Sequence, residues 1–577
     1  MKIIKLVVKN FRGISSLEWS TDQQPLCCLI GPGDSLKSTV LDAIEAVLSS
    51  RWFSFGEGDF NQCETTSDIK IEATVGELSK ALLSDEKFGL YIRGLAPDGK
   101  IRDEPEDGDE PLLTVRLSVD ATMEPLWEVV NDRAHYPRVM SNRDRALFRV
   151  VRLTGDDAKH LTWGQGSILA KLTESGDEAA QQLAAAYRAA KSSAQLDKID
   201  SLVEVANAAQ KRAIEVGAQV SDQYRPGLEL GRGGFSSGSI TLHDGQVPLR
   251  LAGTGTRRLA TLAIQRAAID EGAIVLVDEI EQGLEPHRIL GAIIHLKKSQ
   301  REAVDASRPT GQILMTTHSD VALGEIEPEA LFVCRRKGVG QMNILHPNDL
   351  PALKRVLKHS PRALFAKRIL VCEGDTELGL MLGMREHYPE NHGGVTIEQR
   401  GSAIVDGQGT SAPLVAAAIS ALGYPTALFR DSDVAVPAAQ QKELDWSSVV
   451  TITYASDISI DQAIFSAASE DYVVDKLLLI AEDFKGEATI VDQINKAFPE
   501  VGSAGVGDTS FSDWEFNPPI SRQVAIERLG SLAKKNSWFK NRYISRSLAP
   551  LIGRAIQHDQ FSELAIALKR IENGFYA

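Results

Sequence analysis

Two acidic segments in the second half of the sequence carry the residues best suited to metal chemistry. In the first, residues 367–377 (KRILVCEGDTE), the apolar run from Ile369 to Val371 is followed by Glu373 and then by Glu377. The apolar run has the length and composition of a buried strand, and Glu377 falls in the first turn of the helix expected after it. The sequence therefore predicts carboxylates just beyond a strand end.

The second acidic segment, residues 429–433 (FRDSD), follows the short apolar run 427–429 and contains Asp431 and Asp433. Alternate residues of an extended segment point to the same side, so we expect both carboxylates to face one spot. Acidic strand ends at one edge of a parallel sheet repel each other unless cations lie between them, and oxygen ligands suit Mg²⁺ or Mn²⁺. The two segments predict a metal site; strand-end acids that cap neighbouring helices are the alternative.

A phosphate-binding pattern lies near the N-terminus, at residues 31–39 (GPGDSLKST). A glycine-bearing loop followed by Lys-Ser-Thr and a helix is typical of loops whose backbone N–H groups hold nucleotide phosphates. In this pattern Lys37 meets the β- and γ-phosphate oxygens and Ser38 binds Mg²⁺. We expect ATP to be held here by Gly31, Gly33, Lys37, Ser38 and Thr39.

Leu36 departs from this pattern, because such loops normally have glycine at its position. A side chain there crowds the phosphates or disfavours a positive φ. The sequence therefore favours nucleotide binding over nucleotide hydrolysis.

Three later motifs extend the nucleotide site. An apolar strand pattern at 273–277 ends in Asp278 and Glu279, which is typical of a Walker B strand whose aspartate holds Mg²⁺ and whose glutamate polarises water. Another strand pattern, 312–317, ends at His318, which resembles a switch histidine.

The third motif, residues 251–258 (LAGTGTRR), resembles the signature loop of ABC-type ATPases through Gly253 and Gly255. Such loops contact the γ-phosphate of a nucleotide bound to a partner subunit. The four motifs in this order resemble an ABC-type nucleotide-binding domain.

Strand patterns at 3–11 and 25–30 and an amphipathic helix ending at Leu48 would position the phosphate loop. Residues 82–125 contain an acidic Gly/Pro-bearing run that predicts an exposed hairpin or loop insertion. Residues 178–220 are rich in alanine and have apolar positions at helical spacing. We expect two helices or a helical arm there that mediates dimerisation; a helix packed inside the domain is the alternative.

The charge of the sequence is unevenly distributed. The net charge is −15, which argues against a generally basic coat for nucleic acid. Residues 521–550, however, hold seven basic residues and only one acid. This basic block is either a solvated helix face or a surface for a phosphodiester substrate. The five cysteines show no metal spacing, and no apolar run is long enough for a membrane span, so we expect a cytoplasmic protein.

Glu373-Gly374-x-x-Glu377 followed by Asp431-x-Asp433 resembles the Toprim domain of topoisomerases, primases and OLD (overcoming lysogenization defect) nucleases, over residues 363–540. The tyrosines lie in no context typical of a topoisomerase. An ABC-type ATPase split by a helical insertion, followed by this Toprim pattern and a basic helical tail, resembles the OLD nuclease family across nearly the whole chain.

The resemblance implies a metal-dependent DNA endonuclease that uses Mg²⁺ or Mn²⁺ and whose ATPase half binds ATP. Glu373, Asp431 and Asp433 match the first metal site of the family. Glu377 matches a ligand of the second metal, and Asp461 stands where the family more often has glutamate. Lys540, in the run 538–540 (WFK), matches the catalytic lysine, so the expected catalytic residues are Glu373, Glu377, Asp431, Asp433 and Lys540.

The resemblance also implies partners and a setting. Members act on DNA, form homodimers or higher homo-oligomers without a membrane, and often serve bacterial antiphage defence, some with a helicase or a reverse-transcriptase (retron-like) partner. An ATP-sensing DNA-binding or DNA-repair ATPase with a non-catalytic Toprim domain is the main alternative. An SMC-like DNA-organising ATPase would need long heptad arms, which the segment 178–220 is too short to form.

The expected fold is α/β: an ABC-type ATPase domain split by a helical dimerisation insertion, then a Toprim domain with a helical C-terminal tail. The expected boundaries are 1–165 and 236–345 for the ATPase domain, 166–235 for the insertion, 346–362 for a linker, 363–545 for the Toprim domain and 546–577 for the C-terminal helices.

Overall fold

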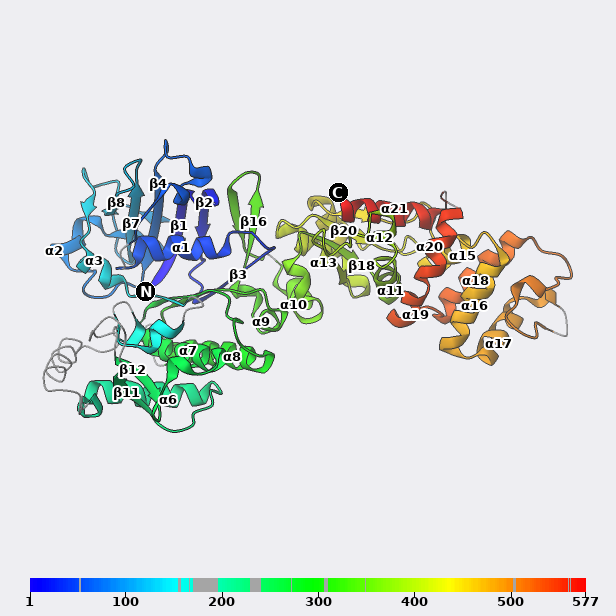
Figure 1. The fold of residues 1–577 in the computed structure, drawn as a ribbon. Helices are drawn as coiled ribbons and strands as arrows, with labels where there is room; N and C mark the ends of the chain where they lie inside the picture. Colours follow the sequence, from blue (N-terminus) through cyan, green and yellow to red (C-terminus); the bar gives the residue numbers. More distant parts are fainter. Residues whose placement is uncertain are drawn as a thin grey trace. The chain divides into compact units, whose positions relative to one another are not determined.

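The computed structural model forms two compact units, Met1–His346 and Pro347–Ala577, each with its own hydrophobic core. Figure 1 shows the ribbon of both units. The structure describes residues 1–577 except 51–52, 154–156, 165–166, 170–195, 229–239, 271, 306–309, 348, 502–504, 559 and 561. About half of the predicted helical insertion, 166–235, therefore lies outside the described residues. Within the described part of the chain, no helix is long and apolar enough to span a bilayer.

The first unit is built on one large mixed sheet. Five neighbouring strands run parallel and form the half that carries the nucleotide motifs. In order they are β10 (Val150–Leu153), β14 (Ile274–Val277), β15 (Gln312–Thr316), β3 (Leu26–Ile30) and β16 (Leu331–Lys337). All five residues of β3 are buried, as expected for a parallel strand covered on both faces. The strands predicted at 25–30, 273–277 and 312–317 are thereby confirmed.

The other half of the sheet continues through β17 and is mainly antiparallel. Its strands are β17 (Gln341–Leu345), β2 (Ile14–Ser20), β1 (Lys2–Phe11), β4 (Ile69–Gly76), β7 (Glu110–Val119), β5 (Arg93–Leu95) and β6 (Ile101–Arg102). In addition, β8 (Pro125–Val130) pairs with β7, and β9 (Arg138–Val139) pairs with β8. Helix α1 (Lys37–Leu48) contacts strands of both halves. The acidic run predicted as an exposed hairpin forms the β5–β6 turn and then leads into β7.

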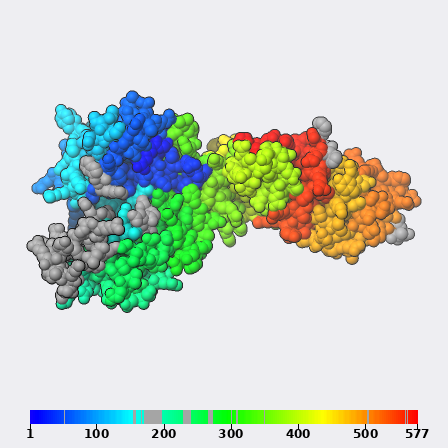
Figure 2. Space-filling model, viewed as in Figure 1, coloured from blue at the N-terminus to red at the C-terminus, as the bar shows by residue number. Residues whose placement is uncertain are grey.

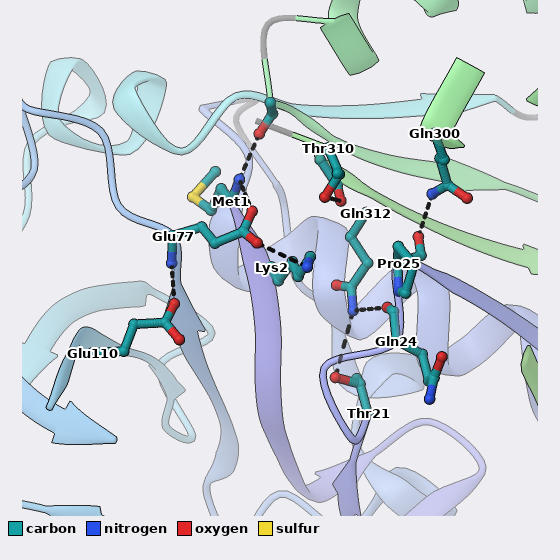
Figure 3. A network of polar contacts seen from close by, with 12 residues as sticks. Met1, Lys2, Thr21, Gln24, Pro25, Glu77, Glu110, Gln300, Thr310 and Gln312 are labelled. Atoms are coloured by element: carbon teal, nitrogen blue, oxygen red, sulfur yellow. Dashed lines mark hydrogen bonds and ion pairs between the residues drawn. The ribbon is translucent and has the colours of Figure 1, made fainter. Parts of the chain in front are cut away.

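A buried glutamine joins the two halves of this sheet. Gln312, at the start of β15, accepts a hydrogen bond from the backbone N–H of Ile3 in β1 (2.8 Å) and donates to the carbonyl of Gln24 (3.0 Å). Figure 3 shows this side chain between the Thr21–Gln24 turn and β15, with Gln300 bonded to Pro25 nearby. Because these backbone groups are buried, their hydrogen bonds fix how the two halves meet.

The other described elements of the first unit are mainly helices and a small sheet. They include α6 (Asp200–Glu215), α7 (Thr254–Asp270), α8 (Pro286–Asp305), β11 (Tyr224–Leu228), β12 (Ile240–Asp244) and β13 (Val247–Pro248). Helix α6 packs on α7 and β11. It is the described part of the segment in which helices are predicted, and its role in dimerisation stays a prediction.

The second unit has a four-stranded, fully parallel sheet in the order β19 (Ser402–Asp406), β18 (Arg368–Cys372), β20 (Thr426–Phe429) and β21 (Val450–Ile452). Helices α10 (Leu350–His359), α11 (Asp375–Met384), α13 (Ala412–Ala421), α14 (Ala438–Trp446) and α15 (Ile460–Ser466) belong to the same unit. Helix α10 packs on α13, so the predicted linker segment is a folded part of this unit.

The C-terminal region is helical, as predicted. It consists of α16 (Asp471–Lys485), α17 (Glu487–Ala497), α18 (Arg522–Asn536), α19 (Arg542–Ser547), α20 (Ala549–His558) and α21 (Glu563–Tyr576). Helices α19 and α20 pack on α11, and α21 packs on β21. Figure 2 shows the red C-terminal residues directly beside yellow-green residues of the same unit. The tail therefore returns to the sheet rather than ending away from it.

Candidate metal and nucleotide sites

The parallel sheet of the second unit brings several acidic residues to one edge. In register, Cys372 at the end of β18 pairs with Phe429 of β20 on one side and with Asp406 of β19 on the other. Glu373 and Asp431 therefore follow neighbouring strand ends. Carboxyl ends of parallel strands are where such sheets bind ligands.

A cleft of about 610 Å³ opens at this edge. Of the predicted site residues, Glu373, Glu377, Asp431, Asp461 and Lys540 line it. The other lining residues are Gly374, Asp375, Thr376, Asp406, Gln408, Gly409, Ser459, Ile460, Lys534, Ser537 and Arg542. The structure thus gathers four predicted carboxylates and the predicted catalytic lysine around one space, with additional charges of both signs.

Backbone amides orient three of the carboxylates. Oε2 of Glu373 accepts from the N–H of Asp431 (3.1 Å), and Oε2 of Glu377 accepts from the N–H of Gly374 (2.9 Å) at the start of α11. Oδ1 of Asp431 accepts from the N–H of Ile460 (2.6 Å), where α15 begins. Each bond fixes one carboxylate oxygen and leaves the other able to bind a cation.

Burial raises the pKa of every carboxyl group in this cluster for which a shift is resolved. The pKa values of Asp431 and Glu377 lie well above their ordinary range, mainly because both groups are buried. The charge of Glu377 further raises the pKa of Asp431, and the charge of Glu373 further raises the pKa of Glu377. Burial raises the pKa of Glu373, against the nearby Arg430, and raises the pKa of Asp461 to about 6. Because burial disfavours the ionised carboxylates, a positive charge has to lie beside them for the cluster to be fully ionised.

Asp433 lies near the other carboxylates, since its charge raises the pKa values of Glu373, Asp431 and Asp461, but it is held differently. Strand β20 ends at Phe429, and the following residues form bends rather than an extended segment. The alternation on which the prediction rested therefore stops before Asp431. Asp433 forms an ion pair with Lys534 instead and is not among the residues that line the cleft.

The fit of these residues to a divalent cation rests on their chemistry. They supply oxygen donors only, which suits Mg²⁺ or Mn²⁺. Oδ1 of Asp461 is buried and has no hydrogen-bond partner among the described residues, so one donor remains uncommitted. Among those same residues, no three acidic, histidine or cysteine side chains lie close enough together to hold one ion as they stand. Cation binding therefore requires side-chain rotation at this edge.

Aromatic packing fixes the position of Lys540. Trp538 and Phe539 are fully buried and both contact the ring of Phe465 on α15, the helix that also carries Asp461. Trp538 also donates from its indole to Gln493 (2.7 Å). Lys540 itself is exposed, lines the cleft and forms no ion pair within the described part of the chain. Its ammonium is thus available to an anionic ligand.

Asp375, Asp406 and Arg542 are cleft residues that sequence reasoning did not assign to the site. Nε of Arg542 pairs with Oδ1 of Asp375 (2.6 Å), and its Nη2 pairs with Asp406. Asp406 could have been predicted from the sequence, because it directly follows the apolar strand pattern 403–405. Glu373 follows its own apolar run in the same way. The pairing of Arg542 has no local signal, since its partners are far away in the sequence.

In the first unit, Lys37 lies inside the phosphate loop. Its Nζ donates to the carbonyl oxygens of Gly31 (3.2 Å) and Pro32 (3.0 Å) and to Oγ of Ser35 (3.1 Å). Burial lowers the pKa of this ammonium. A nucleotide phosphate would replace these neutral acceptors with charged ones, which bind an ammonium more strongly.

Ser38 and Asp278 meet as the nucleotide motifs predict. Oδ1 of Asp278 accepts from Oγ of Ser38 (3.0 Å) and from Oγ1 of Thr316 (2.7 Å). Thr39 follows in the first turn of α1 and is half-buried. This arrangement can hold Mg²⁺ between a hydroxyl and a carboxylate, as expected for a nucleotide site.

Glu279 and His318 lie beside this pair. Glu279 is exposed and has φ of 47°, and its N–H donates to Oγ1 of Thr316 (2.8 Å). The N–H of His318 donates to Glu281 (2.6 Å), and burial, together with the charge of Lys37, lowers the pKa of the imidazole.

The two glycines of the signature loop lie at the start of α7. Gly253 is exposed just before α7, and Gly255 is in its first turn. A Cβ added at Gly255 would lie closest to the side chain of Arg288 and the carbonyl of Gly283, each 2.9 Å away. Their predicted action on a partner's nucleotide stays a prediction.

Leu36 has a positive φ of 65°, a conformation that a leucine side chain disfavours. Its side chain packs against Gly13, where an added Cβ would lie 2.4 Å from a methyl carbon of Leu36. Gly31 has φ of 142°, and a Cβ there would lie 2.5 Å from the carbonyl oxygen of Cys334. The loop therefore keeps its turn with a leucine at a glycine position, at some cost in backbone strain.

Two buried arginines support the Walker B strand end and were missed from sequence. Arg152 on β10 pairs with Asp278 (3.0 Å) and with Asp42 of α1 (2.7 Å). Arg258 on α7 is fully buried and donates to the carbonyls of Asp278 (2.7 Å) and Glu279 (2.9 Å). The two arginines thus connect β10 and α7 to Asp278, the residue expected to hold Mg²⁺.

Comparisons with known proteins agree with this geometry. A family model described as "AAA domain, putative AbiEii toxin, Type IV TA system" matches residues 164–324, and one described as "Overcoming lysogenization defect protein-like, TOPRIM domain" matches residues 364–433. The chain is thus an ATPase joined to a Toprim domain. The Toprim domain is OLD-like, and its pairing with an ATPase domain is consistent with the OLD family.

No curated protein matches the sequence. Among solved structures, the Smc head bound to the C-winged helix domain of ScpA is similar at 16% identity and a TM-score of 0.38, covering 61% of this chain and 100% of that one. The Smc head with an extended coiled coil bound to the C-terminal domain of ScpA, derived from Pyrococcus furiosus, is similar at 14% identity and a TM-score of 0.37, covering 62% and 98%. The Thermotoga maritima SMC head domain is similar at 14% identity and a TM-score of 0.30, covering 60% and 100%.

The ATPase domain implies nucleotide binding, and the pairing of ATPase and Toprim domains indicates an enzyme that processes nucleic acid. The first unit has an ABC-type ATPase fold with a large mixed sheet, and the second has the parallel Toprim sheet with its helical tail.

Proposed function

We propose that this protein is a metal-dependent DNA endonuclease whose activity is regulated by ATP binding. The observation that supports it best is the cleft of the second unit, where four buried or half-buried carboxylates with raised pKa values share one space with the exposed side chain of Lys540. This charge pattern suits a phosphodiester whose negative charge increases during attack.

In this proposal Glu373, Glu377, Asp431 and Asp461 hold Mg²⁺ or Mn²⁺. Bound cations would lower the pKa of the attacking water and neutralise the leaving 3′ oxygen. Asp433 joins them only after its ion pair with Lys534 opens. Lys540, held by its buried aromatic neighbours, offsets charge on the phosphate as the water adds.

The ATPase domain would act as a regulator. The phosphate loop and Asp278 can hold ATP with Mg²⁺. Because Leu36 is strained at a position where such loops have glycine, we expect this loop to hydrolyse ATP slowly. We further propose a homodimer or higher homo-oligomer, because signature loops of this type act on a partner's nucleotide. A setting in bacterial antiphage defence, with a helicase or reverse-transcriptase partner, follows from the resemblance to OLD nucleases.

A plasmid-cleavage assay tests the proposal. Purified full-length protein should nick or linearise plasmid DNA in Mg²⁺ or Mn²⁺ but not in EDTA, and ATP should change the rate. Glu373→Ala should abolish cleavage while leaving the melting temperature near that of the wild type. Failure of the wild type to cut any DNA in either metal, at all nucleotide conditions, would favour the alternative of an ATP-sensing DNA-binding protein with a non-catalytic Toprim domain.

A further inference from the structure

Among the described lysines, Lys534 alone both lines the cleft and pairs with Asp433. It lies in the last turn of α18, lines the cleft, and forms an ion pair with Asp433. The side chain of Lys534 is about half exposed (47%), whereas that of Asp433 is almost buried (9%). One end of the pair is therefore fixed, and the other belongs to a flexible side chain at the edge of the cleft.

The charge of Lys534 also reaches Asp461. Both Lys534 and Lys540 favour the ionised form of Asp461, which opposes the rise in its pKa caused by burial. Asp433 in turn repels the charges of Glu373 and Asp431. The ammonium of Lys534 thus lies between carboxylates of the proposed metal site and balances part of their charge.

We propose that Lys534 competes with a divalent cation for Asp433, and that cation binding transfers its ammonium from Asp433 to the DNA phosphate. Lys534 then becomes a second substrate-contacting residue beside Lys540. This inference rests on the proposed function, since it assumes that the cluster binds a cation.

The physical argument concerns which positive charge Asp433 prefers. A half-exposed lysine–carboxylate pair contributes little free energy, because water screens it and the side chain loses freedom in forming it. A cation with two charges bound by several oxygens outcompetes such a pair. The ammonium of lysine is carried on a flexible four-carbon stem, so once released it can turn toward the cleft that Lys534 already lines.

Lys535 provides a matched control. It is the next residue of α18, carries the same charge, is exposed, and forms no ion pair within the described part of the chain. A general electrostatic effect of removing one positive charge should be the same for Lys534→Met and Lys535→Met. Competition for Asp433 should appear only in Lys534→Met.

The first measurement is binding of Mn²⁺ to the full-length chain by titration calorimetry, without DNA. We expect Lys534→Met to bind Mn²⁺ about three- to fivefold tighter than the wild type, which is the range that an exposed ion pair can account for. Lys535→Met should stay within about twofold, as expected for a screened charge. Lys534→Arg, which keeps a cation at this position, should restore an affinity close to that of the wild type.

The second measurement is DNA affinity by fluorescence anisotropy, in a Lys540→Ala background that slows cleavage. Lys534→Met should weaken DNA binding in Mn²⁺ and leave it unchanged in EDTA, where Asp433 holds the lysine. Lys535→Met should have the same effect in both conditions.

Two results would overturn the inference. If the wild type binds Mn²⁺ and the two lysine variants behave alike, Lys534 is an ordinary surface charge and the proposed nuclease function stands without it. If the wild type binds no Mn²⁺ at all, the proposed metal site itself fails, and this inference fails with it.

Discussion

The N–H of Asp431 donates to Oε2 of Glu373 (3.1 Å), and the N–H of Glu373 donates to the carbonyl of Phe429 (2.9 Å). The hydrogen bonding between β18 and β20 thus continues one residue beyond the strands and uses a carboxylate as its last acceptor. Glu373 therefore has two tasks, since one oxygen orients the segment that carries Asp431 and the other is available to a cation.

Asp431→Asn should abolish cleavage and preserve the fold. The amide keeps an oxygen that can accept from the N–H of Ile460, as Oδ1 of Asp431 does now. It removes the charge that burial already disfavours, so we expect an unchanged or slightly higher melting temperature. Loss of a metal ligand should reduce single-turnover cleavage by about 10³-fold, equivalent to several kcal/mol of transition-state stabilisation. Cleavage at the wild-type rate by a correctly folded variant would contradict the assignment.

Cation binding should strengthen as pH rises. Burial raises the pKa values of Asp431, Glu377 and Asp461, the last to about 6, so these groups keep protons in the folded state that the unfolded chain loses near pH 4. Without cations, the free energy of unfolding of the second unit therefore falls as pH rises from about 4 to above 6. With Mn²⁺ the bound protons are released, so Mn²⁺ should raise the melting temperature more at pH 8 than at pH 5.5.

Calorimetry in two buffers that differ in ionisation enthalpy checks this directly. At neutral pH, Mn²⁺ binding should release protons, and Asp431→Asn should reduce the number released. Equal Mn²⁺ affinity at pH 5.5 and pH 8 would show that these carboxyl groups do not bind the ion.

Lys540→Ala should lower the rate of cleavage with little loss of DNA affinity, because a residue that acts on the transition state affects kcat rather than ground-state binding. Lys535→Ala, by contrast, should weaken DNA binding and reduce its dependence on salt, with near-normal cleavage once DNA is saturating. Anisotropy at several salt concentrations and single-turnover cleavage measure the two effects. Normal cleavage by Lys540→Ala at saturating DNA would leave Lys540 as an electrostatic contact only.

Nucleotide binding should depend on Lys37 and hardly on Leu36. Lys37→Ala removes the ammonium that lies inside the phosphate loop, and loss of charge-assisted hydrogen bonds should weaken ATP binding by about tenfold or more. Leu36→Gly removes the strain of a left-handed leucine, which is worth about 1–2 kcal/mol. It also loses the contact of the leucine side chain with Gly13, which is worth a comparable free energy. We expect its ATP affinity, measured by calorimetry, to stay near that of the wild type. A large loss would mean that the leucine side chain itself shapes the site.

Gly379→Ala should destabilise the second unit, because the added methyl group would lie 2.5 Å from Cβ of Ser545 and 2.6 Å from the carbonyl of Arg542. Overpacking of this kind costs about 1–3 kcal/mol, more than alanine gains in helix propensity. Gly574→Ala in α21 is the control, since no described atom lies within 4 Å of its added Cβ. The control should be neutral or up to about 1 kcal/mol more stable in denaturant unfolding. Equal stability of both variants would contradict the close packing of α11 on α19.

Sequence patterns predicted the strands and loops that carry both sites, because buried strands and glycine loops have local signals. Glu373, Glu377 and Asp431 lie at the predicted sheet edge, since each follows an apolar strand pattern directly or within one helical turn. The role of Asp433 as a metal ligand stays a prediction, because β20 ends before the alternation could direct its side chain and Lys534 pairs with it. Predicting the Lys534–Asp433 and Arg542–Asp406 pairs would have required knowing where the helical tail packs, and side-chain pairing between distant segments leaves no periodic signal in one sequence.

The cleft has an acidic half and a basic half that come from opposite ends of the second unit. The family model that matches this unit ends at residue 433, whereas Lys534, Lys540 and Arg542 lie far beyond it. Helix α19, which carries Arg542, also spans the predicted boundary after residue 545. A chimera or transplanted domain that ends at 433 would therefore take Glu373, Glu377 and Asp431 but leave behind Asp461 and the basic residues of the cleft. A transferred fragment that keeps the complete site has to extend to the end of α20, whose Ala549 packs on Gly383 of α11.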